Sequence, residues 1–127
     1  MSIGVALERL AEEIERFGST AYVLSVSNDL RPHAVAVDVR WDDDRLVAGV
    51  GKSTAANVSE RPQISLLWPP FEPGGYSLII DGVAELDTEG RLSFAPSKGV
   101  LHRPAPQGAS SSSDCVPLVS DSSERQI

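Results

Sequence analysis

The residues best suited to chemistry in this sequence lie close together, between positions 51 and 57. Gly51 ends an apolar run and is followed by Lys52, Ser53 and Thr54, with Asn57 three residues further on. A glycine turn that leads into a helix leaves unpaired N–H groups pointing outward, and the helix dipole together with a lysine ammonium favours a negative charge there. These residues predict a phosphate site, and they fit an ordinary capped connector between two strands equally well.

One nucleotide-binding motif is ruled out by its spacing. Gly51-Lys52-Ser53 looks like the end of a nucleoside triphosphate-binding loop, but that loop needs a glycine five residues before the Gly-Lys pair. Leu46 occupies that position. The sequence therefore argues against a kinase or an ATPase.

The elements around these residues place them between two strands. Residues 47–50 are an apolar run that predicts a strand, and residues 52–58 predict a short helix in which the Ser53 and Thr54 hydroxyls cap the first turn. Arg61-Pro62 should end this helix, because proline disfavours the helical conformation in the residue before it. In residues 63–68, Ile64, Leu66 and Trp68 then alternate with Gln63, Ser65 and Leu67, a strand-like pattern with one strongly apolar face.

Composition narrows the classes of function. The chain has 127 residues and a net charge of −7, with 18 acidic and 11 basic residues. Such an acidic surface repels phosphate backbones, so we expect no nucleic acid partner. A single cysteine, Cys115, excludes an intrachain disulfide and a cysteine-based zinc site. The sequence shows no membrane-spanning run and no signal-peptide pattern, so we expect a cytoplasmic protein without a membrane partner.

The rest of the chain predicts a mostly β fold. Apolar spacing predicts an amphipathic N-terminal helix over residues 3–17 that ends at Gly18, and alternating or apolar runs predict strands over residues 20–27, 32–41, 45–50, 63–68 and 76–86. Gly82 is expected to mark a bulge in the fifth of these strands. A sixth strand begins at residue 91, and Pro96 should interrupt it. The fold class is therefore a six-stranded antiparallel split barrel with an N-terminal helix and a short internal helix.

Two features of the second strand have both a functional and a structural interpretation. Ala34 and Ala36 lie on one face and leave room for a flat ligand, although they would equally accommodate a neighbouring helix. His33 lies on the other, apolar face, where a hydrogen-bonded structural histidine is expected rather than a catalytic one.

The composition changes near residue 104. A Pro-Gln-Gly segment and a run of four serines follow, and few apolar residues lie beyond them. We therefore divide the chain into a split-barrel domain, residues 1–104, and a Ser-rich C-terminal tail, residues 105–127. Cys115 lies in this tail, with no neighbouring base to activate it as a nucleophile.

Taken in order, these pieces resemble the FMN-binding split-barrel family, the pyridoxamine 5′-phosphate oxidase-like proteins. The matching parts are the N-terminal helix, the strand pair over residues 22–41, the Asn57-Val58-Ser59-Glu60-Arg61-Pro62 segment with the strand after it, and residues 76–86 with Asp81-Gly82-Val83-Ala84. The resemblance covers residues 5–103 and depends on the order and spacing of these pieces rather than on one motif.

The resemblance implies a homodimer with two FMN or deazaflavin sites at the subunit interface. Its cofactor-binding residues here would be Val50, Gly51, Lys52, Ser53, Thr54, Asn57 and Ala36, with Tyr76 and Ser77 from the other subunit. Lys52, Ser53, Thr54 and Asn57 would hold the phosphate, and backbone near Val50 and Gly51 would support the ring. No residue stands out as a general acid or base, as expected when the cofactor transfers hydride to or from a small planar substrate.

A second hypothesis is a non-catalytic dimeric module that binds a flavin, haem or another small ligand. The family's phosphate segment has a lysine three residues before the asparagine and an arginine directly before it. Thr54 and Ala56 take those places here, although Asn57 is kept. Each charge-assisted contact to a phosphate contributes roughly 1.5–3 kcal/mol, so the loss of two contacts favours weaker phosphate binding or another ligand.

Overall fold

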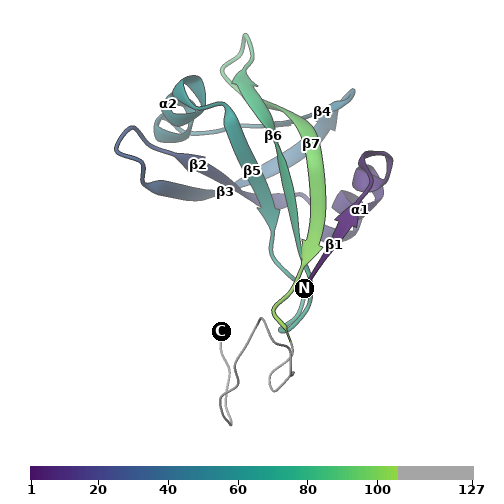
Figure 1. Ribbon diagram of the computed structural model, residues 1–127. Helices are drawn as coiled ribbons and strands as arrows, with labels where there is room; N and C mark the ends of the chain where they lie inside the picture. Colours follow the sequence, from purple (N-terminus) through teal and green to yellow (C-terminus); the bar gives the residue numbers. More distant parts are fainter. Residues whose placement is uncertain (106–127) are drawn as a thin grey trace.

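The computed structural model describes residues 1–105 (Figure 1). Seven strands, two α-helices and one 3₁₀ helix follow one another along this part of the chain. They are β1 (Ser2–Val5), η1 (Leu7–Arg9), α1 (Leu10–Phe17), β2 (Thr20–Val26), β3 (Pro32–Asp42), β4 (Arg45–Ala48), α2 (Lys52–Glu60), β5 (Gln63–Trp68), β6 (Ser77–Leu86) and β7 (Leu92–His102). The mostly β class predicted from the sequence is confirmed.

Six of the strands close into an antiparallel barrel. The sheet order is β1-β7-β4-β3-β2-β5-β6, and an additional pairing of β6 with β7 closes the ring. β7 is long enough to pair with two strands on one edge, with β4 through residues 92–94 and with β1 through residues 99–102. β1 is therefore a seventh strand outside the six-stranded ring, and the sequence did not predict it.

The barrel interior is filled by the inward-facing residues of alternating strands. The core includes Val23, Leu66, Trp68, Leu78 and Phe94, all fully buried. Trp68 also donates its indole N–H to the Gly18 carbonyl oxygen at 2.8 Å, which joins β5 to the turn between α1 and β2. Because these side chains fill the interior, a ligand site must lie at the strand edges, on the outer faces or at the helix ends.

The N-terminal helix is shorter than the sequence predicted. Residues 2–5 form β1 instead of the first helical turn, and α1 begins at Leu10. Ile3 and Val5 have the two-residue spacing of a strand rather than the spacing of a helix face, and this segment pairs with the free edge of β7. The helix ends as expected at Gly18, whose φ of 94° favours glycine.

The irregularity predicted at Gly82 is confirmed in position, but its extra residue lies in β7 and not in the strand of Gly82; the predicted interruption of the last strand is wrong. The register of β6 against β7 shifts between Asp81 and Gly82, and Pro96 lies opposite Gly82 inside a continuous β7. Ser97 is the extra residue, and its hydroxyl donates to the Asp81 carbonyl oxygen at 3.1 Å. The irregular register at this point lets the ladder accommodate a residue that has no N–H to donate.

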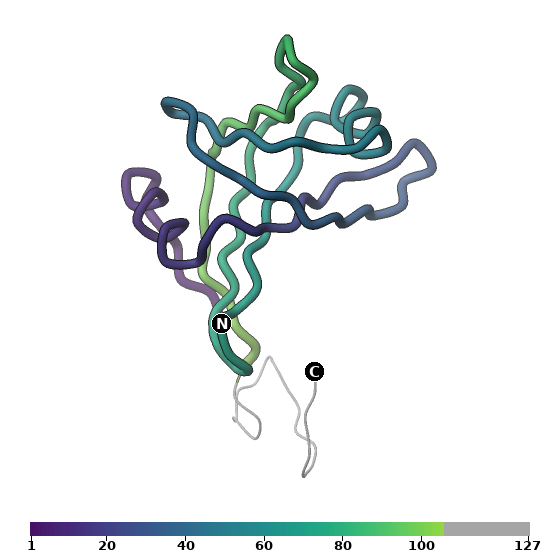
Figure 2. Tube along the Cα trace, turned by 180° about the vertical axis from the view of Figure 1, so that it is seen from behind, coloured from purple at the N-terminus to yellow at the C-terminus, as the bar shows by residue number. Residues whose placement is uncertain are grey.

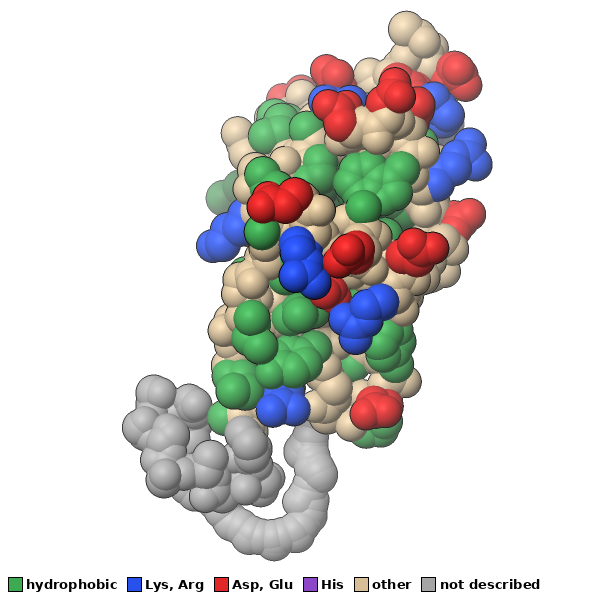
Figure 3. Space-filling view, turned by 90° about the vertical axis from the view of Figure 1, so that its right-hand side faces the viewer, with side chains coloured by type: hydrophobic (Ala, Val, Ile, Leu, Met, Phe, Trp, Pro, Cys, Tyr) green, Lys and Arg blue, Asp and Glu red, His purple; other side chains and the backbone are tan. Residues whose placement is uncertain are grey.

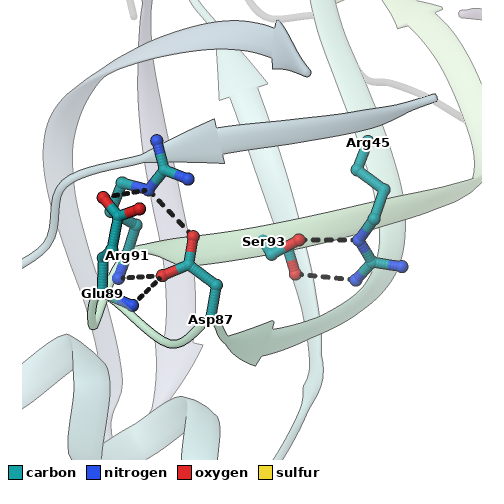
Figure 4. Close-up of polar contacts among 5 residues, drawn as sticks. All are labelled: Arg45, Asp87, Glu89, Arg91 and Ser93. Carbon is teal, nitrogen blue, oxygen red and sulfur yellow. Dashed lines mark hydrogen bonds and ion pairs between the residues drawn. The ribbon is translucent and has the colours of Figure 1, made fainter. Parts of the chain in front are cut away.

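The turn between β6 and β7 is organised by one carboxylate (Figure 4). Asp87 Oδ1 accepts from the backbone N–H groups of Arg91 and Glu89, both at 2.9 Å, and Oδ2 accepts from Arg91 Nε at 2.8 Å. The hydrogen bond from the Arg91 backbone N–H, together with the one from the Arg91 guanidinium, holds the pKa of Asp87 below its ordinary value. The turn therefore keeps its carboxylate ionised at neutral pH.

The serine-rich tail and Cys115 lie outside the described residues, so the domain boundary at residue 104 stays a prediction. No helix within residues 1–105 is long and apolar enough to cross a membrane. On the face shown in Figure 3, acidic and basic side chains are interspersed among hydrophobic ones.

Candidate functional site

The first turn of α2 presents unpaired backbone donors. Gly51 is the N-cap, with φ −83° and ψ −179°, and among residues 1–105 no side-chain hydrogen bond caps the helix. The Ala55 N–H donates to the Gly51 carbonyl oxygen at 3.0 Å, so the N–H groups of Lys52, Ser53 and Thr54 precede the first helical hydrogen bond. The hydroxyl cap expected from the sequence is wrong, because both hydroxyl residues lie inside the helix rather than at its cap.

The side chains of α2 divide into an outer and an inner set. Lys52 and Ser53 are exposed, whereas Thr54 is 2% and Asn57 is 8% exposed. The Asn57 carboxamide nitrogen donates to the Ser25 hydroxyl oxygen at 3.1 Å, which fixes the helix to β2. An anion that approaches from solvent would therefore meet Lys52, Ser53 and the first-turn N–H groups before it met Thr54 or Asn57.

The barrel is split where β4 stops pairing with β3, and this opening lies beside the N-terminus of α2. β4 pairs with β3 only through residues 39–42 of β3, whereas β2 pairs with β3 through residues 32–38. Within the described chain, no strand covers the second edge of β3 over residues 32–38. In Figures 1 and 2 the β2–β3 hairpin extends from the barrel on the side where α2 lies. This free strand edge offers backbone donors and acceptors to a ligand.

The small residues expected to support a ring lie along this part of β3. Ala34 and Ala36 are both exposed, so no described helix covers them. Val50 is half-buried and packs against the core, and Gly51 is exposed. β4 ends at Ala48 and α2 begins at Lys52, so only three residues separate the split from the helix end.

Tyr76 and Ser77 lie at the opposite end of the barrel. Ser77 pairs with His102, whereas Val83, six residues along β6, pairs with Gln63 close to the end of α2. At about 3.3 Å per residue, six residues correspond to roughly 20 Å. One protomer therefore does not bring Tyr76 and Ser77 together with the α2 residues, and their predicted contact with the cofactor requires a second chain.

Tyr76 is already engaged within its own chain. Its ring lies beneath the Arg103 guanidinium, with 4.7 Å from the Arg103 Cζ to the ring centroid. The Arg103 and Met1 backbones are joined by two hydrogen bonds, which hold the first residue against the end of β7.

A row of apolar side chains crosses the outside of the barrel, and it was not predicted from the sequence. It consists of Ala36, Tyr22, Leu67, Ile79 and Val100, one residue from each of β3, β2, β5, β6 and β7, each directly opposite the next. Their neighbours along each strand point inward, so the row faces outward, and Tyr22 is 39% exposed. Period-2 alternation indicates the outward positions, but only the strand registers show that they form one row.

His33 on β3 also differs from what the sequence predicted. Its Nδ1 is buried and, within residues 1–105, has no hydrogen-bond partner. The prediction of a hydrogen-bonded histidine is therefore wrong for this atom, although Ser25 lies directly opposite on β2 and accepts from Asn57.

The chain is similar to two uncharacterized proteins in sequence and to several solved structures in fold. No protein-family model matches the chain. Two uncharacterized proteins, Mb0449c of Mycobacterium bovis and MT0457 of Mycobacterium tuberculosis, are each 34% identical to it, over 88% of this chain and 90% of theirs.

Three crystal structures share the architecture at low identity. A proposed pyridoxamine 5′-phosphate oxidase of Listeria innocua has a TM-score of 0.62 at 18% identity, over 75% of this chain and 96% of that one. An FAD-binding protein of Mesorhizobium loti has a TM-score of 0.61 at 10% identity, over 80% and 96%. The haem-storage protein HutZ of Vibrio cholerae has a TM-score of 0.58 at 13% identity, over 79% and 96%.

Proposed function

Because the chain belongs to the same family as the two mycobacterial proteins and has the fold of the FMN-binding split barrels, we propose that it is a flavin- or deazaflavin-binding oxidoreductase. A bound flavin or deazaflavin would supply hydride transfer to or from a small planar substrate. The observation that carries the proposal is the free edge of β3 over residues 32–38. It begins where β4 stops pairing with β3 at Ala48, three residues before the first turn of α2.

The two ends of such a cofactor fit the two parts of the site. An isoalloxazine ring carries several carbonyl and ring-nitrogen atoms, which the unpaired backbone of β3 can match, and Ala34 and Ala36 leave its approach open. The phosphate fits the α2 N-terminus, where Lys52, Ser53 and unpaired N–H groups converge. Thr54 and Asn57 face inward, so we assign them to positioning the helix. The direct contact of these two side chains with the phosphate stays a prediction.

The proposal includes a homodimer. Tyr76 and Ser77 reach a cofactor at α2 only from a second chain, and the outer apolar row offers a surface on which that chain can pack. An exposed Tyr22 flanked by Ala36 and Leu67 is typical of an interface core, where aromatic residues are enriched and charges are depleted. A cytoplasmic location stays a prediction from the sequence.

Two observations favour the alternative, a dimeric binding module without catalysis. Thr54 and Ala56 replace the basic residues of the family's phosphate segment, and the structurally similar HutZ is a haem-storage protein. Mass spectrometry of small molecules released from protein purified without added cofactor identifies the ligand. Release of haem alone supports the binding module, and a released flavin or deazaflavin supports the oxidoreductase only if the loaded protein also transfers hydride to or from a substrate.

Lys52→Ala is expected to weaken FMN binding at least about ten-fold. The exposed ammonium adds one charge-assisted contact to the phosphate, worth roughly 1.5–3 kcal/mol, and 1.4 kcal/mol corresponds to ten-fold in affinity. The melting temperature of the apoprotein should stay nearly unchanged, since exposed side chains contribute little to folding. Quenching of FMN fluorescence on titration with protein measures the affinity.

Lys98→Ala is the matched control, because Lys98 is also exposed and is the only other lysine. It lies in β7 opposite Asp81, away from the residues of α2. Equal FMN affinity in Lys52→Ala and the parent chain would contradict the phosphate assignment.

Tyr22→Glu is expected to convert a dimer into a monomer. A carboxylate in the outer apolar row, between Ala36 and Leu67, would be buried without a partner in the dimer, which costs several kcal/mol. Light scattering after size-exclusion chromatography should give twice the 13.5 kDa chain mass for the parent and the single mass for the variant. Thr88→Glu, in the exposed β6–β7 turn, introduces the same charge and should remain dimeric. A monomeric parent protein would overturn the shared site.

A further inference from the structure

We propose a second ligand site, for a small carboxylic acid with an apolar body, in the groove between the C-terminal half of α2 and strands β4, β6 and β7. The groove has a volume of about 560 Å³ and is lined by Arg45 and Glu85 together with apolar side chains. That volume lies within the range of roughly 300–1,000 Å³ typical of small-molecule sites. None of its lining residues belongs to the proposed cofactor site.

The polar end of the groove is an arginine held in one orientation (Figure 4). Arg45 Nε donates to the Ser93 hydroxyl oxygen at 2.6 Å, and Nη2 donates to the Ser93 carbonyl oxygen at 3.0 Å. A guanidinium has five N–H donors in a planar fork, and these two bonds occupy only one edge of it. The other edge, between Nη1 and Nη2, suits a carboxylate, which binds guanidinium groups through two parallel hydrogen bonds.

The present partner of that edge is weakly held. Glu85 Oε2 lies 3.6 Å from Arg45 Nη2, longer than a hydrogen bond, and the Glu85 side chain is 71% exposed. Exposed ion pairs of this kind contribute little free energy. The Arg45 side chain is only 34% exposed, so a ligand carboxylate beside it would be better shielded from water than Glu85 is.

The remaining lining fixes the chemistry of the ligand body. It is contributed by side chains without charge and mostly without hydrogen-bonding groups, among them Val58, Pro62, Val83 and Ala95. Val83 is 47% exposed, so covering it removes apolar surface from water. The last-turn carbonyls of α2 make the Val58 end of the groove electronegative, which places the ligand carboxylate at Arg45 and the apolar body beneath the helix.

NMR titration of the ¹⁵N-labelled full chain with hexanoate and with hexanamide tests the site. We expect hexanoate to shift the Val83 and Ala95 amide signals and the Arg45 Nε signal, with an affinity at least ten-fold higher than that of hexanamide. The amide has the same apolar body and no charge, so this ratio isolates the carboxylate. Unshifted groove signals, or equal affinity for the two probes, would overturn the proposal.

Two variants add independent evidence. Arg45→Gln should lower hexanoate affinity to that of hexanamide, and Glu85→Gln should raise hexanoate affinity several-fold without changing that of hexanamide. Arg45 also joins β4 to β7, so the Arg45→Gln variant can fail to fold. In that case Glu85→Gln tests the site, and unchanged hexanoate affinity in Glu85→Gln counts against it. Arg40→Gln, an exposed arginine on β3, is the control and should bind as the parent does. All these measurements are independent of whether a flavin binds.

Discussion

Trp68→Ala should lower the free energy of unfolding by about 3–5 kcal/mol, the usual cost of removing a buried aromatic side chain. Trp68 is fully buried at the end of β5. Its indole N–H also donates to the Gly18 carbonyl oxygen at 2.8 Å, so alanine would leave both a cavity and an unpaired carbonyl. Urea denaturation followed by circular dichroism measures the change.

Trp68→Phe is the milder variant. Phenylalanine keeps most of the apolar volume but removes the N–H donor and two ring carbons, so it should cost about 1–3 kcal/mol. Trp41→Ala is the comparison for position, because Trp41 is only half-buried at the edge of the core and should cost less. A loss below 1 kcal/mol in Trp68→Ala would show that β5 is not anchored as described.

Gly82→Ala should destabilise the fold by about 3 kcal/mol, the upper end of the range for inserting one methyl group into a packed core. A Cβ at this position would lie 2.3 Å from the Ala95 carbonyl oxygen and 2.6 Å from Phe94 Cζ. The first of these atoms belongs to the backbone of the paired strand, so it can move away only if the bulge itself opens. The same denaturation experiment measures the effect.

Gly4→Ala provides the matched control. Gly4 also lies in a strand that pairs with β7, and a Cβ there would meet no atom within 4 Å. We expect its stability to equal or slightly exceed that of the parent, because alanine has less conformational freedom to lose on folding than glycine. Equal stability of the Gly82→Ala and Gly4→Ala variants would refute the close approach at the bulge.

Sequence patterns predicted the interior of the barrel well, because each strand has one buried face. Gln63–Trp68 has the bounds expected from its alternation, and the bulge falls at the expected glycine. The errors occur where pairing with a distant strand decides the outcome. The Ser2–Val5 strand depends on the free edge of β7, and the continuity of β7 past Pro96 depends on the irregular register there.

The candidate site was predicted in outline but not in orientation. The glycine turn and the helix after it are where the sequence placed them, because turn and proline signals are local. The inward direction of Thr54 and Asn57 was not predicted, since a nine-residue helix with few apolar residues gives no clear buried face. The free edge of β3 was also missed, because it depends on where β4 stops pairing.

The position of β7 in the ring has a consequence for biosynthesis. β7 is the last strand of the described chain, yet it supplies pairing for β1, β4 and β6. As the protein is made from its N-terminus, these three strands leave the ribosome with unpaired edges and wait for residues 92–102 to arrive. Closure of the ring is thus a late, non-local step, the kind that folds slowly and is prone to edge-to-edge association in the nascent chain.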